Sequence, residues 1–537
     1  MRLKYHLAFV LLCICLWELP AKIGPLIPQP AEVIQGTDTF VFTQDTRIML
    51  KDPEIRAACD LFLEMFRRST GLNIGYASSG SSLITVDIDP GMIHPEAYHI
   101  KVTEHDVSIK AKTPAGVFYA FQTIRQLLPP EVESLTVMDC DWKIPGVEIK
   151  DIPRFRYRGL LLDVARHFFP VSFLKRYIDL MAMYKYNYLH LHLTDDQGWR
   201  IEIPAYPRLQ TISAWRNETL IGHLDDRPRR YDGIRYGGYY KQSELKELVR
   251  YAAERYITII PEIDMPGHAT AVLAAYPELS CSGGHYEVAR EWGVLKNIYC
   301  PKEETFLFLE KVLTEVMDIF PGEYIHLGGD EAVKEQWEQS EYCRNLKMQH
   351  HLQTDEQLQI WFMQRMTNFV NSKGRKVIGW DEIMDGGEIP GTTVMSWRGE
   401  EGGVKAARKG HDAIMTPHKY CYLDYYQWRN RDEEPLAIGG YTPLSKVYMY
   451  DPVPAQLNGE QAGHILGAQG NLFTEYIADE RHAEYMAFPR VCALSEVVWS
   501  PLSGKSYDDF LVRLREHSKR LDILGVHFAR HFLGQQR

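Results

Sequence analysis

Eight apolar runs separated by helical or loop-rich stretches are the feature that most constrains the fold of this chain. The runs cover residues 158–163, 186–193, 256–263, 323–327, 376–380, 392–397, 411–416 and 464–472. Between them, the 3.6-residue periodicity of amphipathic helices recurs at 172–184, 243–255, 303–319 and 354–373. Repeated strand-then-helix units favour an α/β fold, a (β/α)8 TIM barrel with a parallel central sheet. A doubly wound open sheet is the main structural alternative.

A smaller α+β domain, with a mixed sheet plus helices, is expected before the barrel. Residues 39–43, 83–88, 97–102 and 106–111 alternate between apolar and polar as strands do, and 53–69 and 114–128 have helical spacing. This part of the chain contains no catalytic constellation. The stretch from Asp151 to Arg158 then reads as a linker into the barrel.

The first 22 residues have the pattern of an export signal. Arg2 and Lys4 precede the apolar run from Leu7 to Trp17, which is too short to span a membrane comfortably. We therefore expect an exported protein, periplasmic or secreted, without a membrane span. Cys13 and Cys15 leave a lipid anchor open. The net charge of -11 argues against nucleic acid or an anionic membrane surface as the main partner.

Cys281 and Cys300 bracket a loop-like segment rich in Gly and Ser. In an exported protein they are the pair expected to form a disulfide, and closing this loop would contribute about 3 kcal/mol in the chain-entropy model. Two separate buried thiols are the alternative.

Polar and aromatic residues gather near the ends of the predicted strands. In chain order they are Arg158, Asp163 and Arg166-His167; His190, His192, Asp195 and Asp196; Glu262 and His268; Asp330 and Glu331; Trp380; Trp397; Tyr422 and Asp424; Phe473 and Glu475. The carboxyl ends of barrel strands open into the loops that build the site. This composition suits a sugar ligand, because aromatic rings can stack on the apolar face of the sugar while carboxylates and arginine bind its hydroxyl groups.

The stretch Tyr324-Ile-His-Leu-Gly-Gly-Asp-Glu331 delivers two adjacent carboxylates to the end of one strand. The two glycines permit positive φ, so that both acids can turn toward one cavity. Carboxyl groups crowded into one site push their pKa values apart, as acid catalysis near neutral pH requires. The alternative is a strand-end turn with solvated acids.

His190 and His192 require separate consideration, because a His-x-His at the end of a barrel strand can bind a catalytic metal. Alternation along a strand places both on one face. The polar strand ends that follow are mostly Trp, Tyr and acids, without an obvious set of further histidine ligands. We therefore favour a hydrogen-bonded role that supports Asp195 or Glu331.

Four motifs in order carry a family resemblance over roughly residues 24 to 500. They are Arg158-Gly-Leu-Leu-Leu-Asp163-Val-Ala-Arg-His167, His192-Leu-Thr-Asp195-Asp-Gln-Gly-Trp-Arg, Pro261-Glu-Ile-Asp-Met-Pro-Gly-His268 and His326-Leu-Gly-Gly-Asp330-Glu331. Together they resemble the family 20 glycoside hydrolases, the β-N-acetylhexosaminidases. The expected segments are then a signal peptide over 1–22, a non-catalytic α/β domain over 23–150, the catalytic barrel over 151–505 and a C-terminal helical segment over 506–537 packed on the barrel.

The resemblance implies an exo-acting enzyme that removes terminal non-reducing GlcNAc or GalNAc from glycans without a metal or other cofactor. The mechanism would be retaining and substrate-assisted, because the 2-acetamido oxygen attacks the anomeric carbon and forms an oxazolinium ion. By similarity, Glu331 protonates the leaving oxygen and later activates water. Asp330 orients the acetamido N–H.

The remaining site residues also follow from the resemblance. Arg158 resembles the arginine that holds the C3 and C4 hydroxyls, with Asp424 and Glu475 completing these contacts. Trp380 and Trp397 resemble the walls of the acetamido pocket, and Tyr422 its donor to the carbonyl oxygen. Asp195, His192, Glu262 and His268 resemble the network around the acid. Phe473 departs from the family, which usually has tryptophan there as a platform for the terminal sugar, so stacking is expected to be weaker.

Two other functions remain open at this point. One is a metal-dependent barrel hydrolase that uses His190 and His192, and the other is a non-catalytic glycan-binding protein that kept the pocket. The choice between GlcNAc and GalNAc, the linkage and the oligomeric state do not follow from the sequence.

Overall fold

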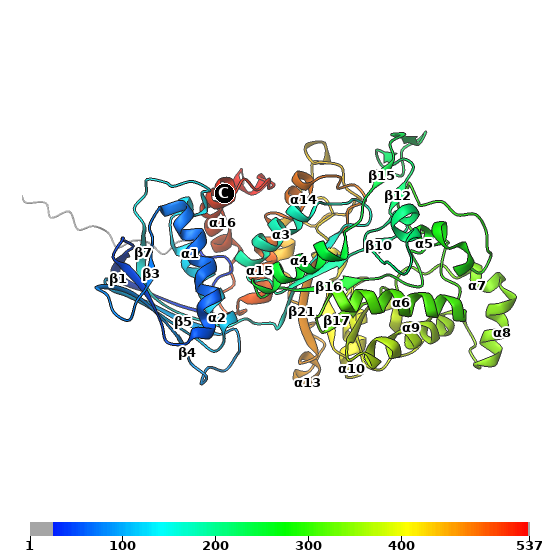
Figure 1. The fold of residues 1–537 in the computed structure, drawn as a ribbon, viewed down its shortest axis with the longest axis horizontal. Helices are drawn as coiled ribbons and strands as arrows, with labels where there is room; N and C mark the ends of the chain where they lie inside the picture. The colour runs from blue at the N-terminus through cyan, green and yellow to red at the C-terminus, as the bar shows by residue number, and fades with distance from the viewer. Residues whose placement is uncertain (1–24, 535–537) are drawn as a thin grey trace, which may run out of the picture.

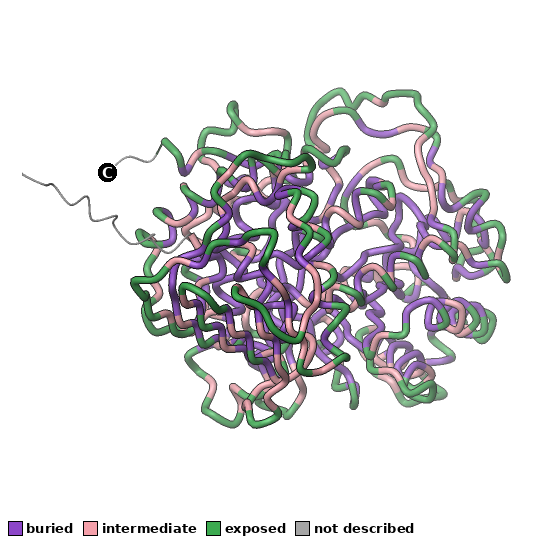
Figure 2. Tube along the Cα trace, turned by 60° about the vertical axis from the view of Figure 1, so that its left-hand side comes forward, coloured by how far each residue is buried: buried purple, intermediate pink, exposed green. Residues whose placement is uncertain are grey.

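The computed structural model describes residues 25–534, which form an N-terminal α/β domain and a larger closed barrel (Figure 1). The predicted export signal lies outside the described residues. No helix within residues 25–534 has the length and apolar character needed to cross a bilayer. Buried stretches of the chain lie mostly in the interior of the molecule, and exposed stretches lie mostly at its periphery (Figure 2).

The N-terminal domain is a seven-stranded mixed sheet covered by two helices. Its strands are β1 (Glu32–Val41), β2 (Thr46–Leu50), β3 (Gly75–Tyr76), β4 (Ser82–Ile88), β5 (Tyr98–Val102), β6 (Asp106–Ala111) and β7 (Lys143–Asp151), in the order β1-β7-β5-β6-β4-β2-β3. Helices α1 (Arg56–Thr70) and α2 (Pro114–Leu127) pack together through Phe62 and Phe121, whose ring centroids lie 4.7 Å apart. The predicted α+β domain with a mixed sheet is therefore confirmed.

The second part is a closed barrel of eight parallel strands. They are β8 (Tyr157–Asp163), β9 (Tyr188–His192), β16 (Thr258–Glu262), β17 (Tyr324–His326), β18 (Lys376–Trp380), β19 (Thr392–Ser396), β20 (Ala413–Met415) and β21 (Ile465–Leu472). All eight coincide with the predicted apolar runs, to within two residues at each end. The doubly wound sheet is excluded because β8 pairs with both β21 and β9 and thereby closes the ring.

Helices surround the barrel. The four predicted ones are α3 (Val171–Met183), α4 (Gln242–Ala253), α6 (Glu303–Ile319) and α9 (Asp355–Ser372), and they are joined by α10 (Glu401–Arg408), α14 (Glu480–Ala487) and α15 (Arg490–Trp499). Helix α9 begins where the Thr354 side chain accepts a hydrogen bond from the Gln357 backbone N–H, which satisfies one free donor of the first turn. These helices bury their apolar faces against the strands and fix the positions of the loops.

The segment Asp151–Arg158, predicted as a linker, connects β7 of the N-terminal domain to β8 of the barrel, and its two ends are buried. Asp151 is 3% exposed; its carboxylate lies 3.0 Å from Lys185 Nζ and accepts from the Trp499 indole N–H. Lys185 follows α3 and Trp499 ends α15, so that residues of the barrel hold the last strand of the N-terminal sheet. A charged network therefore joins the two domains.

Helix α16 (Tyr507–Ile523) contacts both domains (Figure 1). The Arg520 guanidinium lies 2.5 Å from Glu133, which belongs to the N-terminal domain and also binds Arg125. Arg513, two turns earlier on the helix, binds Glu496 of α15. The C-terminal helix thus ties the small domain to the barrel.

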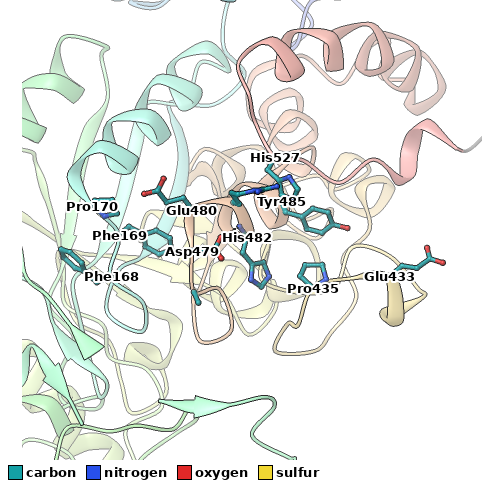
Figure 3. A pocket seen from close by; sticks show the side chains of 12 residues that line it. Phe168, Phe169, Pro170, Glu433, Pro435, Asp479, Glu480, His482, Tyr485 and His527 are labelled. Atoms are coloured by element: carbon teal, nitrogen blue, oxygen red, sulfur yellow. Dashed lines mark hydrogen bonds between the residues drawn. The ribbon is translucent and has the colours of Figure 1, made fainter. Parts of the chain in front are cut away.

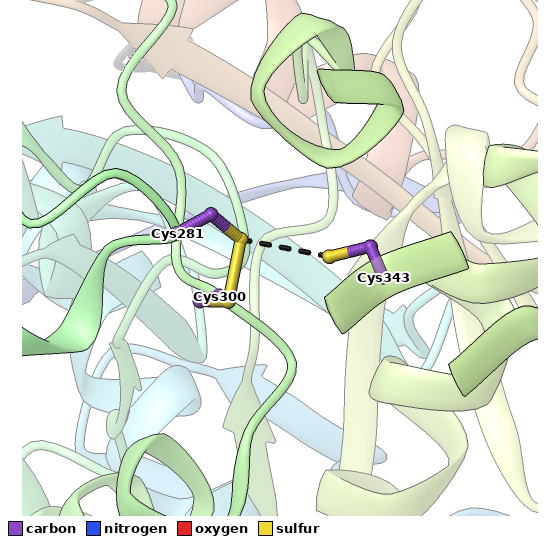
Figure 4. A group of neighbouring side chains, drawn as sticks. All are labelled: Cys281, Cys300 and Cys343. Carbon is purple, nitrogen blue, oxygen red and sulfur yellow. Dashed lines mark hydrogen bonds between the residues drawn. A yellow bond between two sulfur atoms is a disulfide. The ribbon is translucent and has the colours of Figure 1, made fainter. Parts of the chain in front are cut away.

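Three cysteine sulfur atoms lie together beside the barrel (Figure 4). Cys281 and Cys300 form a disulfide, which confirms the predicted pairing. Cys343, on α8 (Glu341–Gln349), places its Sγ 3.5 Å from that of Cys281. The loop before Cys300 and the helix after the Asp330-Glu331 pair therefore meet at one point.

Candidate active site

The predicted polar strand ends converge at the carboxyl end of the barrel. Parallel strands in a closed ring all end on the same side, so the residues that follow them face one opening. The catalytic candidates Asp330 and Glu331 follow β17, and their neighbours on either side follow β16 and β18. The site is therefore assembled from most of the strands around the ring.

Two glycines shape the turn that carries Asp330 and Glu331. Gly328 and Gly329 have φ of 68° and 103°, and Glu331 itself has φ of 48°. A Cβ on Gly328 would lie 1.7 Å from Oδ1 of Asp264, so no other residue fits there. The turn brings both carboxylates to one side, where His268 Nε2 lies 3.6 Å from Asp330 Oδ2 and 3.6 Å from Glu331 Oε2.

The two acids differ in exposure. The Asp330 side chain is 18% exposed and that of Glu331 is 34% exposed. Burial raises the pKa of Asp330 to about 6, helped by Glu262 and Glu331 and opposed by His268. Asp330 is thus the inner acid, and Glu331 is the one that reaches the opening.

A chain of hydrogen bonds holds His268, the residue that lies beside both acids. His268 Nδ1 lies 3.2 Å from Asp195 Oδ1 and 3.2 Å from Asp196 Oδ2, and His192 Nε2 lies 2.9 Å from Asp195 Oδ2. Burial alone would lower the pKa of His268, but Asp195 and the other hydrogen-bonding acids raise it well above its ordinary value. The structure therefore brings together Asp195, His192 and His268 as the sequence predicts.

Glu262 is the centre of a second, fully buried group. It binds His192 Nδ1, accepts from the Trp380 indole N–H at 2.9 Å, and lies 3.0 Å from His190 Nε2 and 3.1 Å from His326 Nδ1. Both ring nitrogens of His192 are thus engaged by carboxylates, Glu262 and Asp195. This arrangement favours a hydrogen-bonded role for His190 and His192, in support of the acids, rather than metal ligation.

The prediction for Arg158 is wrong. Arg158 lies at the amino end of β8, is 0% exposed, and donates to both carboxylate oxygens of Glu96 in the N-terminal domain, at 2.8 and 2.7 Å. A residue at that end of a barrel strand points away from the site. Arg158 is part of the domain junction.

Arg166 stands where the sugar-binding arginine was expected. It follows the carboxyl end of β8, and its guanidinium lies 2.7 Å from Asp195, 3.2 Å from Asp163 and 3.9 Å from Glu475. The sequence already distinguishes the two arginines, because Arg158 begins the apolar run 158–163 whereas Arg166 follows it. The order of the two arginines along the strand decides which one reaches the opening.

Three of the predicted site residues each have a buried carboxylate oxygen with no hydrogen-bond partner among the described residues. They belong to Asp330 (Oδ1), Asp424 (Oδ1) and Glu475 (Oε2). Burial and the neighbouring Glu475 raise the pKa of Asp424 well above its usual range, and burial raises the pKa of Glu475. Unpaired buried acceptors are costly, so these oxygens are placed to receive donors such as N–H or O–H groups of a ligand.

The four predicted aromatic residues form one connected cluster. The Trp397 and Tyr422 ring centroids lie 6.1 Å apart, Tyr422 and Phe473 5.5 Å, and Phe473 and Trp380 6.3 Å. Phe473 also meets His192 edge-on at 5.7 Å, and the Arg166 guanidinium lies 5.4 Å from its ring centroid. Phe473 is therefore placed among the other site residues.

Sequence reasoning missed Asp264. It lies two residues after Glu262, is 2% exposed, and its Oδ2 has no partner among the described residues. Burial and the charge of Asp330 raise its pKa well above the ordinary value. The signal was present in the Pro-Glu-Ile-Asp-Met-Pro-Gly-His motif, in which Asp264 is the second acid.

A separate cavity of about 800 Å³ lies outside this group (Figure 3). Phe168 and Phe169 from the loop after β8 line it, together with Asp479, which precedes α14, and His482 and Tyr485 of that helix. None of the predicted site residues lines it. The catalytic candidates and this surface cavity are thus distinct.

Comparisons with known families agree with this geometry. The family model described as glycosyl hydrolase family 20, catalytic domain, matches residues 155–502. The model described as glycosyl hydrolase family 20, domain 2, matches residues 24–152.

Individual relatives are similar over most of the chain. A protein named Beta-hexosaminidase from Porphyromonas gingivalis is 41% identical over 510 residues, which cover 94% of this chain and 64% of that protein. The solved GH20 beta-N-acetylhexosaminidase of Streptomyces coelicolor A3(2) has a TM-score of 0.83 and 33% identity, covering 95% of this chain and 98% of that one. A mutant Streptomyces plicatus beta-hexosaminidase, solved in complex with the product GlcNAc, has a TM-score of 0.82 and 34% identity, covering 95% and 97%.

Proposed function

Because the chain belongs to glycosyl hydrolase family 20, we propose that it is an exo-acting β-N-acetylhexosaminidase. It removes terminal non-reducing N-acetyl-β-D-hexosamine, GlcNAc or GalNAc, from glycans. The reaction is retaining and substrate-assisted, through an oxazolinium intermediate. The chain spans 64% of the length of the P. gingivalis relative.

One observation carries the mechanism: the two carboxylates at the opening are adjacent residues on one turn. Retaining enzymes with a protein nucleophile place an acid and a nucleophile on opposite faces of the sugar, about 5 Å apart. Asp330 and Glu331 have Cα atoms about 3.8 Å apart, and both side chains face His268. If one of these acids protonates the leaving group, the other lies on the same side of the sugar and cannot attack the anomeric carbon from the opposite face. The nucleophile is therefore the substrate's own acetamido oxygen.

The two acids then take different roles. Glu331, the more exposed, donates a proton to the leaving oxygen and afterwards takes one from water. Asp330, whose Oδ1 is an unpaired buried acceptor among the described residues, receives the acetamido N–H and thereby aims the carbonyl oxygen at the anomeric carbon. An ionised Asp330 also stabilises the positive charge that develops on the ring.

The other strand ends bind the sugar. The unpaired oxygens of Asp424 and Glu475 and the guanidinium of Arg166 face the hydroxyl groups, and the Trp380, Trp397, Tyr422 and Phe473 cluster encloses the acetamido group and the ring. The GlcNAc bound in the similar S. plicatus enzyme supports this choice of sugar.

The test is release of chromophore from three aryl substrates, β-GlcNAc, β-GalNAc and β-glucoside, with and without a thiazoline analogue of the bicyclic intermediate. We expect turnover of the two acetamido sugars, strong inhibition by the thiazoline, and a glucoside rate lower by orders of magnitude. Sensitivity to a chelator would instead favour metal-dependent hydrolysis. Binding of GlcNAc without turnover would favour a lectin-like protein.

We also propose that the protein is exported, to the periplasm or beyond the cell. The Cys281–Cys300 disulfide supports this location, because disulfides persist in oxidising compartments. Activity recovered in the cytoplasmic fraction with both thiols reduced would contradict it.

A further inference from the structure

We propose that Glu382 is a positioning residue of this site, which acts by fixing the indole ring of Trp397 in the acetamido pocket. The inference rests on the proposed function and names a residue that neither the motifs nor the predicted strand ends single out. Glu382 lies in η5 (Asp381–Met384), the single turn that follows β18, and Trp397 follows the neighbouring strand β19.

The contact between the two side chains is direct. The Trp397 Nε1–H donates to the Glu382 carboxyl group, with distances of 3.0 Å to Oε2 and 3.2 Å to Oε1. Trp397 in turn lies against Tyr422, at 6.1 Å between centroids and 25° between planes. A tryptophan ring has two torsions, and this hydrogen bond fixes the position of its N–H edge. The face that Trp397 presents to the acetamido group is therefore set by Glu382.

Glu382 is also unusual in its charge environment. Its side chain is 14% exposed, and burial together with the charges of Asp330 and Asp381 raises its pKa to about 9. The Arg398 guanidinium, which follows Trp397, opposes this shift and lowers the pKa. At neutral pH the carboxyl group thus keeps its proton and adds no negative charge beside Asp330.

A plain ion pair with Arg398 is the competing role for Glu382, and the geometry disfavours it. Arg398 Nε lies 2.9 Å from Asp381 Oδ1 and 3.9 Å from Glu382 Oε1. Its two terminal nitrogens bind Asp385 at 2.8 and 2.9 Å. The guanidinium is therefore satisfied by Asp381 and Asp385, and the Trp397 indole N–H lies closer to Glu382 than Arg398 does.

The experiment compares three variants with the wild type, using an aryl β-GlcNAc substrate and a thiazoline inhibitor. Glu382→Gln keeps an uncharged acceptor for Trp397 and should stay within roughly threefold of the wild-type kcat/KM at pH 7. Glu382→Ala leaves the indole N–H unpaired and should lose roughly 10- to 100-fold in kcat/KM and in thiazoline affinity. Asp385→Ala removes a partner of Arg398 without touching Trp397 and is the matched control, expected to resemble the wild type.

A pH series separates positioning from a merely structural role. Above pH 9 the wild-type Glu382 ionises next to Asp330, so thiazoline affinity should fall relative to that of Glu382→Gln, which cannot ionise. The ratio of the two inhibition constants should change between about pH 7 and pH 10, whereas the loss of a proton from any other group affects both proteins alike. This arm uses a near-isosteric variant and holds even if Glu382→Ala folds poorly.

Three results would overturn the inference while leaving the proposed function intact. These are wild-type kinetics in a folded Glu382→Ala, an equal loss in Glu382→Gln and Glu382→Ala, or an inhibition ratio that is constant with pH. A wild-type protein that does not cleave the aryl β-GlcNAc substrate would instead overturn the proposed function itself.

Discussion

Glu331 and Asp330 are neighbours in sequence but differ in side-chain exposure, and the roles proposed for them follow this difference. The Glu331 side chain is the more exposed, on a backbone held at positive φ, whereas Asp330 is an inner acid with an oxygen unpaired among the described residues. In the proposed mechanism, the outer acid transfers the proton to the leaving group and the inner acid binds the acetamido N–H.

Replacing Glu331 by Gln is the corresponding residue-scale prediction. The amide cannot donate or accept a proton during catalysis, so kcat should fall by roughly 10²- to 10⁴-fold for a substrate with a poor leaving group. Because the amide has nearly the same shape, the dissociation constant of the thiazoline should change little. Steady-state kinetics and inhibitor titration measure the two quantities, and near-normal hydrolysis would refute the assignment.

The two arginines of β8 and its loop give a matched pair. Arg166→Lys should raise KM for the aryl β-GlcNAc substrate by roughly tenfold or more, because a single ammonium group cannot contact Asp163 and Asp195 through two separate nitrogens as the planar guanidinium does. Arg158→Met should leave KM unchanged and lower the unfolding free energy by about 3 kcal/mol or more, because Glu96 loses its buried partner. Michaelis constants and denaturant unfolding distinguish the two variants. A raised KM in Arg158→Met with an unchanged KM in Arg166→Lys would indicate that Arg158, and not Arg166, binds the sugar.

At the scale of elements, the barrel strands could be predicted because a parallel strand covered on both faces is a continuous apolar run. The helices were equally clear from their periodicity. Similarity of motifs alone does not show at which end of a strand a polar residue lies. Arg158 and Arg166 are distinguished only by their order along the chain, since Arg158 lies at the start of β8 and Arg166 follows it. Contacts between separate strand ends, such as Glu382 with Trp397, have no local signature and required the structure.

The cysteine cluster gives an element-scale prediction. In Cys300→Ser, Cys281 is left 3.5 Å from the Cys343 thiol, so oxidative refolding should form a Cys281–Cys343 bridge. This variant should lose less stability than Cys300→Ser/Cys343→Ser, which lacks a bridge at this cluster. For the loop between residues 281 and 343, the chain-entropy model gives a difference of about 4 kcal/mol. Peptide mapping without reduction detects the new bridge, and two equally unstable variants with a free Cys281 would contradict it.

At the scale of the whole molecule, the N-terminal domain is fastened to the barrel by buried charges. Glu133 binds Arg125 within its own domain and Arg520 of α16, which spans the junction. Burial opposes ionisation of Glu133, but the two arginines lower its pKa from 4.5 to about 2. The domain arrangement therefore depends on this carboxylate being charged.

The sign of the pH effect follows directly. Since the folded-state pKa is below the unfolded value, Glu133 contributes stability above pH 4.5, and this contribution is lost as the pH falls toward 2. The loss is on the order of 3 kcal/mol. Glu133→Gln should be less stable than the wild type at neutral pH, with a smaller decline in acid. Unfolding free energies measured from about pH 7 down to about pH 2.5 give both curves, and parallel curves would exclude Glu133 as the titrating group.

In the proposed reaction the substrate's own acetamido oxygen displaces the leaving group. A series of aryl β-glucosaminides with mono-, di- and trifluorinated acetyl groups measures the participation of this oxygen. Each fluorine withdraws electrons from the carbonyl oxygen and barely changes its position. We predict that kcat/KM falls steeply and steadily along the series, by orders of magnitude from acetyl to trifluoroacetyl. A flat series would mean that a group of the protein, or water, attacks the anomeric carbon.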